Sequence, residues 1–238
     1  MTYLDVKRLQ TINPASFRAQ TPYPWVNPAG LLTDAGYDRL RETIPDVSLF
    51  TSHFSETRVY GQQNHDRFSL PYRDDLPVAA PWKAFVAELR GTDYQTFLRR
   101  LIGARSFELS FVWHYTPQGC LVSPHCDSKR KLGSHIFYFN TEQDWDPAWG
   151  GETLILDDGG RLKYRSAPHF EEFERITVAE ALGNHSLLFA RKAHSWHGVR
   201  ALTCPQGHLR KVFIVVINRY SPLDRVRRFF GEPPRGYE

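Results

Sequence analysis

The hydrophobic period of the sequence changes near Gly103, and this change constrains the fold more than any other feature. From residue 107 to residue 115, large apolar or aromatic side chains alternate with other residues, as in a half-buried β-strand. Four further short runs of strand type follow, separated by segments rich in Gly, Pro, Asp and Asn. They span residues 134–140, 152–156, 186–190 and 211–218. Because no helical pattern lies between these runs, we expect an antiparallel sandwich or double-stranded barrel and not a parallel sheet.

The first hundred residues carry a helical period instead. Residues 31–44 place apolar or aromatic side chains at helical spacing, and Pro45 ends the segment. Residues 81–102 show the same spacing more strongly, with a break at Gly91. We therefore expect a single domain over residues 1–238, mainly β with N-terminal helices. Its parts are a helical and irregular N-terminal elaboration (1–103), a β-rich core (104–220) and a basic C-terminal tail (221–238).

The composition is that of a globular protein, with 41% hydrophobic and 14% aromatic residues in 238. The first ten residues contain no apolar segment of signal-peptide type, and no later run is long enough to cross a bilayer. The three cysteines, Cys120, Cys126 and Cys204, are odd in number and lack a Cys-x-x-Cys spacing. This pattern argues against a disulfide framework and a thiolate zinc site. We expect a cytoplasmic protein with no membrane partner.

The formal net charge of +4 comes largely from the C-terminal end, where arginines crowd beside aromatic residues. The arginines are Arg219, Arg225, Arg227, Arg228 and Arg235. No recognisable nucleic-acid-binding motif accompanies them. We therefore interpret the tail as a solvated or core-docked segment and expect no nucleic-acid partner.

The residues that carry chemistry are His125, Asp127 and His197. In an extended strand, residues two apart face the same side, so His125 and Asp127 can point into one cavity while Cys126 points away. Two imidazoles and one carboxylate form the ligand set that leaves open positions on a non-haem Fe(II). A His-x-Asp pair alone is a weak pattern, and surface or capping roles are the alternative. His194 also competes with His197 as the third ligand.

Arg210 opens the apolar strand that follows. Because residues two apart in a strand face the same side, Arg210 shares a strand face with Val212 and Ile214. A charge that faces a core needs an anionic partner, because burying it unpaired costs several kcal/mol. A dicarboxylate co-substrate would provide that partner through a bidentate contact with the guanidinium. The alternative is an arginine exposed at the start of the strand.

Taken in order, these segments resemble the Fe(II)/2-oxoglutarate-dependent oxygenases, and within them the prolyl 4-hydroxylase-like branch. The resemblance covers about residues 107–220. It rests on His125-Cys126-Asp127, Ile136-Phe137-Tyr138-Phe139-Asn140 with Asp144-Trp145, Gly150-Gly151-Glu152, Trp196-His197-Gly198-Val199 and Arg210. His197, but not His194, lies within a matching segment.

The resemblance implies a double-stranded β-helix (jelly-roll, cupin-like) core that binds Fe(II) through His125, Asp127 and His197. It also implies a 2-oxoglutarate site, with the far carboxylate of 2-oxoglutarate at Arg210. Relatives that halogenate replace the carboxylate ligand with a small residue, and this chain retains Asp127. The resemblance therefore implies hydroxylation or a related oxidation.

Three further residues enter through the same resemblance. Tyr138 would hydrogen-bond the far carboxylate of 2-oxoglutarate, and Tyr115 would line the pocket. Each tyrosine could equally be a core aromatic residue with a satisfied hydroxyl group. The segment from His197 to Arg210 is longer than is usual in this branch, because residues 203–208 read as an inserted turn. Arg200 is therefore an alternative to Arg210.

The implied function is a dioxygenase that hydroxylates or otherwise oxidises an unactivated C–H bond. The reaction uses O2, is coupled to decarboxylation of 2-oxoglutarate to succinate and CO2, and is compatible with ascorbate as a reductant. We favour a small molecule or free amino acid as substrate, because aromatic and cationic side chains cluster in the N-terminal part. They are Tyr60, His65, Arg67, Phe68, Tyr72 and Arg73. The alternatives are a peptidyl prolyl hydroxylase acting on a protein, a zinc-dependent hydrolase, or a non-catalytic cupin-like binding module.

Overall fold

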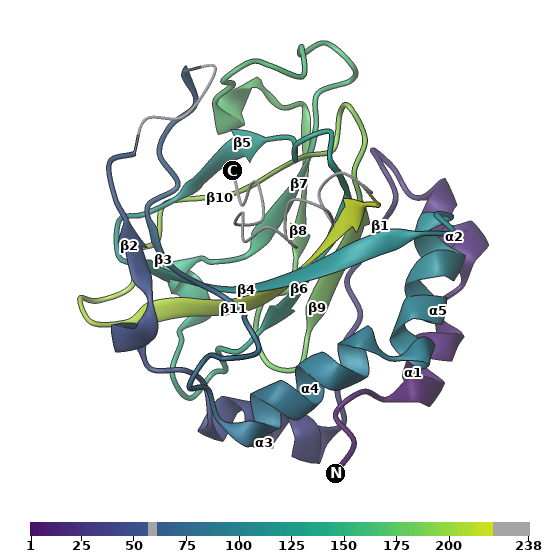
Figure 1. Cartoon of the computed structure of the whole chain (residues 1–238). Helices are drawn as coiled ribbons and strands as arrows, with labels where there is room; N and C mark the ends of the chain where they lie inside the picture. Colours follow the sequence, from purple (N-terminus) through teal and green to yellow (C-terminus); the bar gives the residue numbers. More distant parts are fainter. Residues whose placement is uncertain (57–60, 221–238) are drawn as a thin grey trace, which may run out of the picture.

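The chain forms two antiparallel sheets that face each other across a cavity, with helices on the outer side of the larger sheet (Figure 1). The structure is a computed structural model that describes residues 1–56 and 61–220. The basic tail predicted at residues 221–238 lies outside the described residues. None of the described helices is long and apolar enough to cross a membrane.

Within the described residues, the larger sheet has seven strands and the smaller sheet has four. In sheet order, the larger comprises β1 (Trp25–Val26), β9 (Ser186–Ala190), β6 (Lys131–Tyr138), β11 (Leu209–Arg219), β4 (Phe107–Pro117), β3 (Arg67–Pro71) and β2 (Thr51–His53). The smaller comprises β5 (Val122–His125), β10 (Trp196–Val199), β7 (Thr153–Asp157) and β8 (Arg175–Ala179). The strand order and antiparallel pairing confirm the predicted fold class, a mainly β double-stranded β-helix with N-terminal helices.

The helices pack on the face of the larger sheet that points away from the smaller sheet. They are α1 (Val6–Thr11), α2 (Pro14–Ala19), α3 (Asp34–Glu42), α4 (Ala80–Arg90) and α5 (Thr92–Ile102). Short 3-10 helices lie elsewhere in the chain, at η1 (Val47–Leu49), η3 (Pro147–Trp149) and η4 (Phe170–Glu172). The predicted break between α4 and α5 falls at Gly91. Gly103, with a φ of 77°, ends α5 in the left-handed region where glycine is favoured.

The central strand of the larger sheet is β11, which pairs with β4 on one side and β6 on the other. Alternate residues of these strands face opposite sides. On the outer side, Trp113 and Phe213 lie 4.8 Å apart between ring centroids and pack against Trp82 of α4. On the inner side, β4 presents His114 and Thr116 to the cavity. Both faces of the sheet are therefore buried, one under helices and one under the smaller sheet.

Three strands come from the N-terminal part of the chain, where the sequence predicted only helices and irregular segments. They are β1, β2 and β3, of two, three and five residues. Strands of two or three residues, such as β1 and β2, are too short to display alternation in a sequence. By pairing with β4, β3 extends the larger sheet and contributes a side wall to the cavity.

Candidate metal centre

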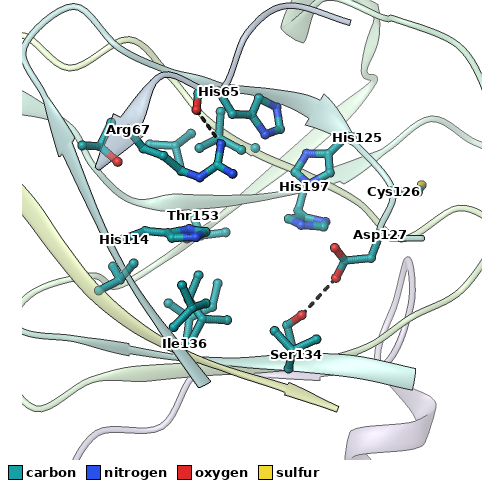
Figure 2. A pocket seen from close by; sticks show the side chains of 18 of the residues that line it. His65, Arg67, His114, His125, Cys126, Asp127, Ser134, Ile136, Thr153 and His197 are labelled. Carbon is teal, nitrogen blue, oxygen red and sulfur yellow. Dashed lines mark hydrogen bonds between the residues drawn. The ribbon is translucent and has the colours of Figure 1, made fainter. Parts of the chain in front are cut away.

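His125, Asp127 and His197 meet at one end of the cavity (Figure 2). His125 ends β5 and lies opposite His197 of β10 in the strand register, so their ring centroids are 4.3 Å apart. Asp127 lies two residues beyond the end of β5, and the side chain of the intervening Cys126 packs in another cluster. One potential ligand atom from each of the three residues lies within 4.8 Å of the other two. The spacing predicted from the sequence thus produces a cluster that could hold a metal ion.

Backbone carbonyl groups orient both imidazole rings. Nδ1 of His125 lies 2.9 Å from the carbonyl oxygen of Ser123, and Nδ1 of His197 lies 3.0 Å from that of Ser195. A carbonyl oxygen only accepts, so each Nδ1 must donate, and the lone pair of the neutral ring is then on Nε2. This is the arrangement by which proteins fix the tautomer and direction of histidine ligands.

Asp127 is buried and enters the cluster as an anion. Burial raises the pKa of its carboxyl group, but the positive charge of Lys131, with smaller contributions from His197 and His125, outweighs burial and holds that pKa well below its usual range. The Lys131 ammonium lies 2.6 Å from one carboxylate oxygen, and the hydroxyl of Ser134 donates to the other at 3.0 Å. The carboxylate is therefore charged and held in position at neutral pH.

The cavity in front of the cluster has a volume of about 480 Å³. Its floor is an apolar surface of the larger sheet, formed by Val112, Ile136, Val212, Ile214 and Val216. Its walls carry polar and charged side chains, among them His65, Arg67, His114, Lys131 and Arg210. A small organic molecule would fit beside a metal ion in a space of this size.

Arg210 lines this cavity on the face of Val212 and Ile214, as the sequence predicts. Its side chain is buried, and burial lowers the pKa of its guanidinium. Nε donates to the carbonyl oxygen of Gly151, and Nη2 donates to Oγ1 of Thr153 at 3.2 Å. Among the described residues, no carboxylate oxygen lies within 4 Å of the guanidinium. A buried cation with only neutral partners is costly unless an anion binds beside it.

Two neighbours support this arginine. The hydroxyl of Tyr138 donates to Oγ1 of Thr153 at 2.9 Å, and the Tyr138 ring lies 5.6 Å from the centre of the guanidinium. Gly151 has a φ of +105°, and a Cβ atom there would lie 3.3 Å from Cδ of Arg210. Glycine at this position therefore allows the backbone to approach the arginine closely.

The structure contradicts the assignment of Tyr115 to the pocket. Tyr115 lies on the helix-packed face of β4, where its hydroxyl donates to the carbonyl oxygen of Pro45 at 2.8 Å and its ring stacks on Phe50. Its neighbour His114 faces the cavity instead. Both faces of β4 are buried, so hydrophobicity alone could not decide which face lines the pocket.

The two alternatives left open by the sequence lie away from the cluster. Arg200 is exposed, and its guanidinium lies 5.1 Å from the ring centroid of Phe170. His194 is exposed, with Nε2 3.1 Å from the carbonyl oxygen of Pro22. Neither residue lines the cavity.

The predicted N-terminal pocket residues separate into two groups. His65 and Arg67 line the cavity, whereas Phe68 and Tyr72 pack on the helix side of the sheet. Arg73 has 71% of its side chain exposed. Tyr60 lies outside the described residues. The sequence did not indicate His114, Lys131 or Thr153, and the only available signal was a polar residue on the inner face of an otherwise apolar strand.

The fold and the cluster together define a class, the double-stranded β-helix proteins with a two-histidine, one-carboxylate site. No family model matches the chain, and no curated protein sequence matches it either. Solved structures do match, and the similarity extends over most of both chains.

A prolyl-4-hydroxylase from Pseudomonas putida is similar at 16% identity, over 82% of this chain and 92% of that chain, with a TM-score of 0.57. A prolyl hydroxylase from Trichoplax adhaerens, solved with a peptide fragment of the hypoxia-inducible factor degradation domain, is similar at 11% identity, over 96% and 94%, with a TM-score of 0.63. A non-heme alpha-ketoglutarate-dependent carbocyclase from nogalamycin biosynthesis is similar at 11% identity, over 95% and 93%, with a TM-score of 0.61. At these identities the similarity shows a shared fold, and it confirms the fold expected from the sequence.

Proposed function

We propose that this protein is an Fe(II)- and 2-oxoglutarate-dependent oxygenase that hydroxylates or otherwise oxidises an unactivated C–H bond. One observation carries the proposal. A buried arginine without a carboxylate partner among the described residues opens into the same cavity as a two-histidine, one-carboxylate cluster. A site with two histidines and one carboxylate alone fits several chemistries. Arg210 adds the requirement for a small anion next to the metal.

The donor set fits ferrous iron. Nε2 of His125, Nε2 of His197 and a carboxylate oxygen of Asp127 would hold the ion and leave positions open for other ligands. Lys131 and Ser134 hold the Asp127 carboxylate from the side, which limits its rotation. These contacts would keep the three ligands oriented while other ligands of the metal exchange.

The environment of Arg210 fits the far carboxylate of 2-oxoglutarate. Thr153 accepts hydrogen bonds from both Arg210 and Tyr138, so the tyrosine would position the arginine through this hydroxyl. A guanidinium in this setting can bind a planar carboxylate through two parallel hydrogen bonds. Tyr138 would thus act through Thr153 as well as through contact of its ring with the guanidinium.

When bound, iron and 2-oxoglutarate supply the oxidising chemistry with O2, and 2-oxoglutarate is converted to succinate and CO2. The chain contributes binding, orientation and exclusion of water. Val212, Ile214 and Ile136 form a floor without polar atoms between the cluster and Arg210. This surface keeps water from competing with substrate near the metal.

A small molecule or free amino acid is the substrate class that we favour. A cavity of about 480 Å³ lies within the usual range for small-molecule sites, and part of it would hold 2-oxoglutarate. The alternative is a peptidyl prolyl hydroxylase. The Trichoplax adhaerens enzyme, which was solved with a bound peptide, is an example of that class. A zinc hydrolase or a metal-free binding module is less consistent with the site, since either would leave Arg210 without an anion.

The three cysteines are free thiols in the structure, and Cys126 and Cys204 are buried. This state fits a reducing compartment, and we propose a cytoplasmic location on that basis.

Succinate formation tests the proposed function. Purified protein should convert 2-oxoglutarate to succinate in the presence of Fe(II) and O2, even without substrate, and ascorbate should prolong the activity. Asp127→Ala should lower the rate at least about a hundredfold, because it removes the only anionic ligand of the cluster. Asp74→Ala is the matched control, since Asp74 is exposed and pairs with Arg90 on the surface. A fully active Asp127→Ala protein would contradict the proposal.

A further inference from the structure

The wall of the cavity formed by β3 carries a cation that the proposed function does not use. Alternate residues of β3 face the helices or the cavity, and Phe68 and Leu70 belong to the helix-packed core. Arg67 and Ser69 therefore face the cavity side, beside His114 of β4, which is the register partner of Ser69. In Figure 2 the side chain of Arg67 extends over the cavity toward His125 and His197.

The guanidinium of Arg67 is incompletely satisfied. Nη1 donates to the carbonyl oxygen of His65 at 2.7 Å, whereas Nε is buried and has no hydrogen-bond partner among the described residues. Burial lowers the pKa of Arg67, and the attraction of Glu56 and Asp66 opposes that shift. Leaving a buried N–H group of a charged side chain unpaired is costly, so a ligand acceptor at this position would be strongly favoured.

The nearby acids are engaged elsewhere. A carboxylate oxygen of Glu56 lies 2.7 Å from Nδ1 of His53, and the Glu56 side chain is 58% exposed. The Asp66 carboxylate accepts from the backbone N–H of Ser55 at 2.9 Å. Within the part of the chain that the structure describes, no carboxylate oxygen lies within 4 Å of the Arg67 guanidinium.

His114 offers a second polar atom on the same wall. Burial lowers the pKa of His114 well below its usual value, and the positive charges of Arg67, Lys131 and Arg210 lower it further. The ring is therefore neutral at physiological pH. Its Nε2 is buried and has no hydrogen-bond partner among the described residues. A neutral imidazole whose Nε2 carries the proton would donate to an anion held by Arg67.

The strand register shows how far the β3 wall lies from Arg210, where 2-oxoglutarate would bind. Thr116 of β4 lies opposite Arg210 of β11, and the Phe68–Tyr115 pairing puts Arg67 across from Thr116 at the next position. The backbones of Arg67 and Arg210 are thus two strands apart, or about 10 Å. The guanidinium of Arg67 is held by His65 and that of Arg210 by Gly151 and Thr153, so the two groups have different partners and can bind two different anions.

Two other cations that line the cavity, Lys131 and Arg210, are assigned to other anions. Lys131 pairs with Asp127, and Arg210 would pair with the far carboxylate of 2-oxoglutarate. The guanidinium plane of Arg67 presents Nε and Nη2 along one edge, which matches the two oxygens of a carboxylate.

We propose that Arg67, with His114, binds a carboxylate group of the substrate, so that the substrate is a small organic acid. This proposal rests on the proposed function, in which iron at His125, Asp127 and His197 and 2-oxoglutarate at Arg210 would occupy two other parts of the cavity. The acid group would be held on the β3 wall, and the rest of the molecule would lie over the apolar floor toward His125, Asp127 and His197. Arg67 would be a specificity-determining residue and not a ligand of the metal or of 2-oxoglutarate.

The test compares acids with their amides. The full-length protein is loaded with Zn(II) and N-oxalylglycine, an unreactive analogue of 2-oxoglutarate, and probe binding is measured by saturation-transfer NMR. The probes are 3-phenylpropionate, N-acetyl-L-leucine and N-acetyl-L-proline, each paired with its primary amide. At least one acid should bind about tenfold or more tightly than its amide, as expected for a charged hydrogen bond.

Variants assign the preference to this wall. Arg67→Gln should reduce the acid preference to less than about threefold, and Arg67→Lys should retain part of it, because the charge is kept without the fork. Arg73→Gln, at an exposed arginine of the same segment, should leave it unchanged. Equal binding of acids and amides, or a preference that persists in Arg67→Gln, would overturn the proposal. Thermal unfolding of each variant checks that it is folded.

The same sample keeps the two proposals apart. The saturation-transfer signal of N-oxalylglycine reports the 2-oxoglutarate site independently of the probes. If N-oxalylglycine binds and no acid is preferred, the inference about Arg67 fails while the proposed function stands. If N-oxalylglycine does not bind to the Zn(II)-loaded protein, the proposed function itself is contradicted.

Discussion

Single buried charges carry most of the functional information in this chain. Asp127 and Lys131 form an ion pair in which both side chains are largely buried, with exposures of 6% and 15%. Arg210 is buried without such a partner among the described residues. Replacing a carboxylate partner by neutral acceptors leaves part of the desolvation cost uncompensated. A ligand that binds beside the charge would relieve that cost, which is why we propose a binding site at Arg210 and not at Lys131.

A buried histidine on the other side of the sheet makes stability depend on pH. His135 of β6 is fully buried under the helices, and the Tyr94 hydroxyl lies 2.7 Å from its Nδ1. Burial lowers the pKa of His135 to about 3, below its ordinary value of 6.5. Protonation therefore favours the unfolded chain, so the stabilisation is complete above pH 6.5 and is lost as the pH falls toward 3.

We expect the free energy of unfolding to fall by up to about 1.4 kcal/mol per pH unit in this window through His135 alone. His135→Gln keeps an acceptor for Tyr94 but does not titrate, so its unfolding free energy should fall less steeply between pH 6 and pH 4. Urea unfolding at several pH values measures both slopes. Parallel curves for the two proteins would contradict the assignment of a neutral, buried His135.

At the scale of elements, β4, β6, β7, β9 and β11 were predictable from runs of strand type, whereas the strands of the N-terminal part were not. The alternation over residues 107–115 predicted β4, and the apolar run over 211–218 predicted β11. The face of β11 that lines the cavity could be identified, because Arg210 is charged and a charge on a buried strand requires a site. The face of β4 could not, since large aromatic residues and His114 lie on two faces that are both buried.

Because Tyr115 lies on the helix-packed face of β4, we expect it to contribute to stability and not to binding. Tyr115→Phe removes the hydrogen bond to the carbonyl oxygen of Pro45 and should lower the free energy of unfolding by about 1 kcal/mol. It should leave the affinity for 2-oxoglutarate unchanged, because the ring lies on the far side of β4 from the cavity. Urea unfolding and a 2-oxoglutarate titration measure the two effects. A large loss of 2-oxoglutarate affinity in this variant would return Tyr115 to the pocket.

At the scale of the whole molecule, the two sheets have different tasks. The larger sheet and its helices form the main hydrophobic core, and its inner face supplies the floor of the cavity and Arg210. The smaller sheet supplies His125 and His197 on adjacent strands. The cluster residues thus come from one sheet, whereas the cavity exists only when the two sheets pack together. The cluster could therefore be predicted from the sequence, and most of the cavity walls could not. β3 is the clearest case, because Arg67 joins the cavity only through pairing with β4.

We propose that one cavity binds both iron and 2-oxoglutarate, with Arg210 holding the far carboxylate. An anaerobic titration of the Fe(II)-loaded protein with 2-oxoglutarate tests it most directly, because chelation of iron by the keto acid gives a weak visible charge-transfer band. The band should appear in the wild-type protein and in Arg200→Gln, a control at an exposed arginine. In Arg210→Gln it should require at least about tenfold more 2-oxoglutarate, since a charged hydrogen bond is lost. A colourless wild-type mixture, or equal titration curves for Arg210→Gln and Arg200→Gln, would contradict the account.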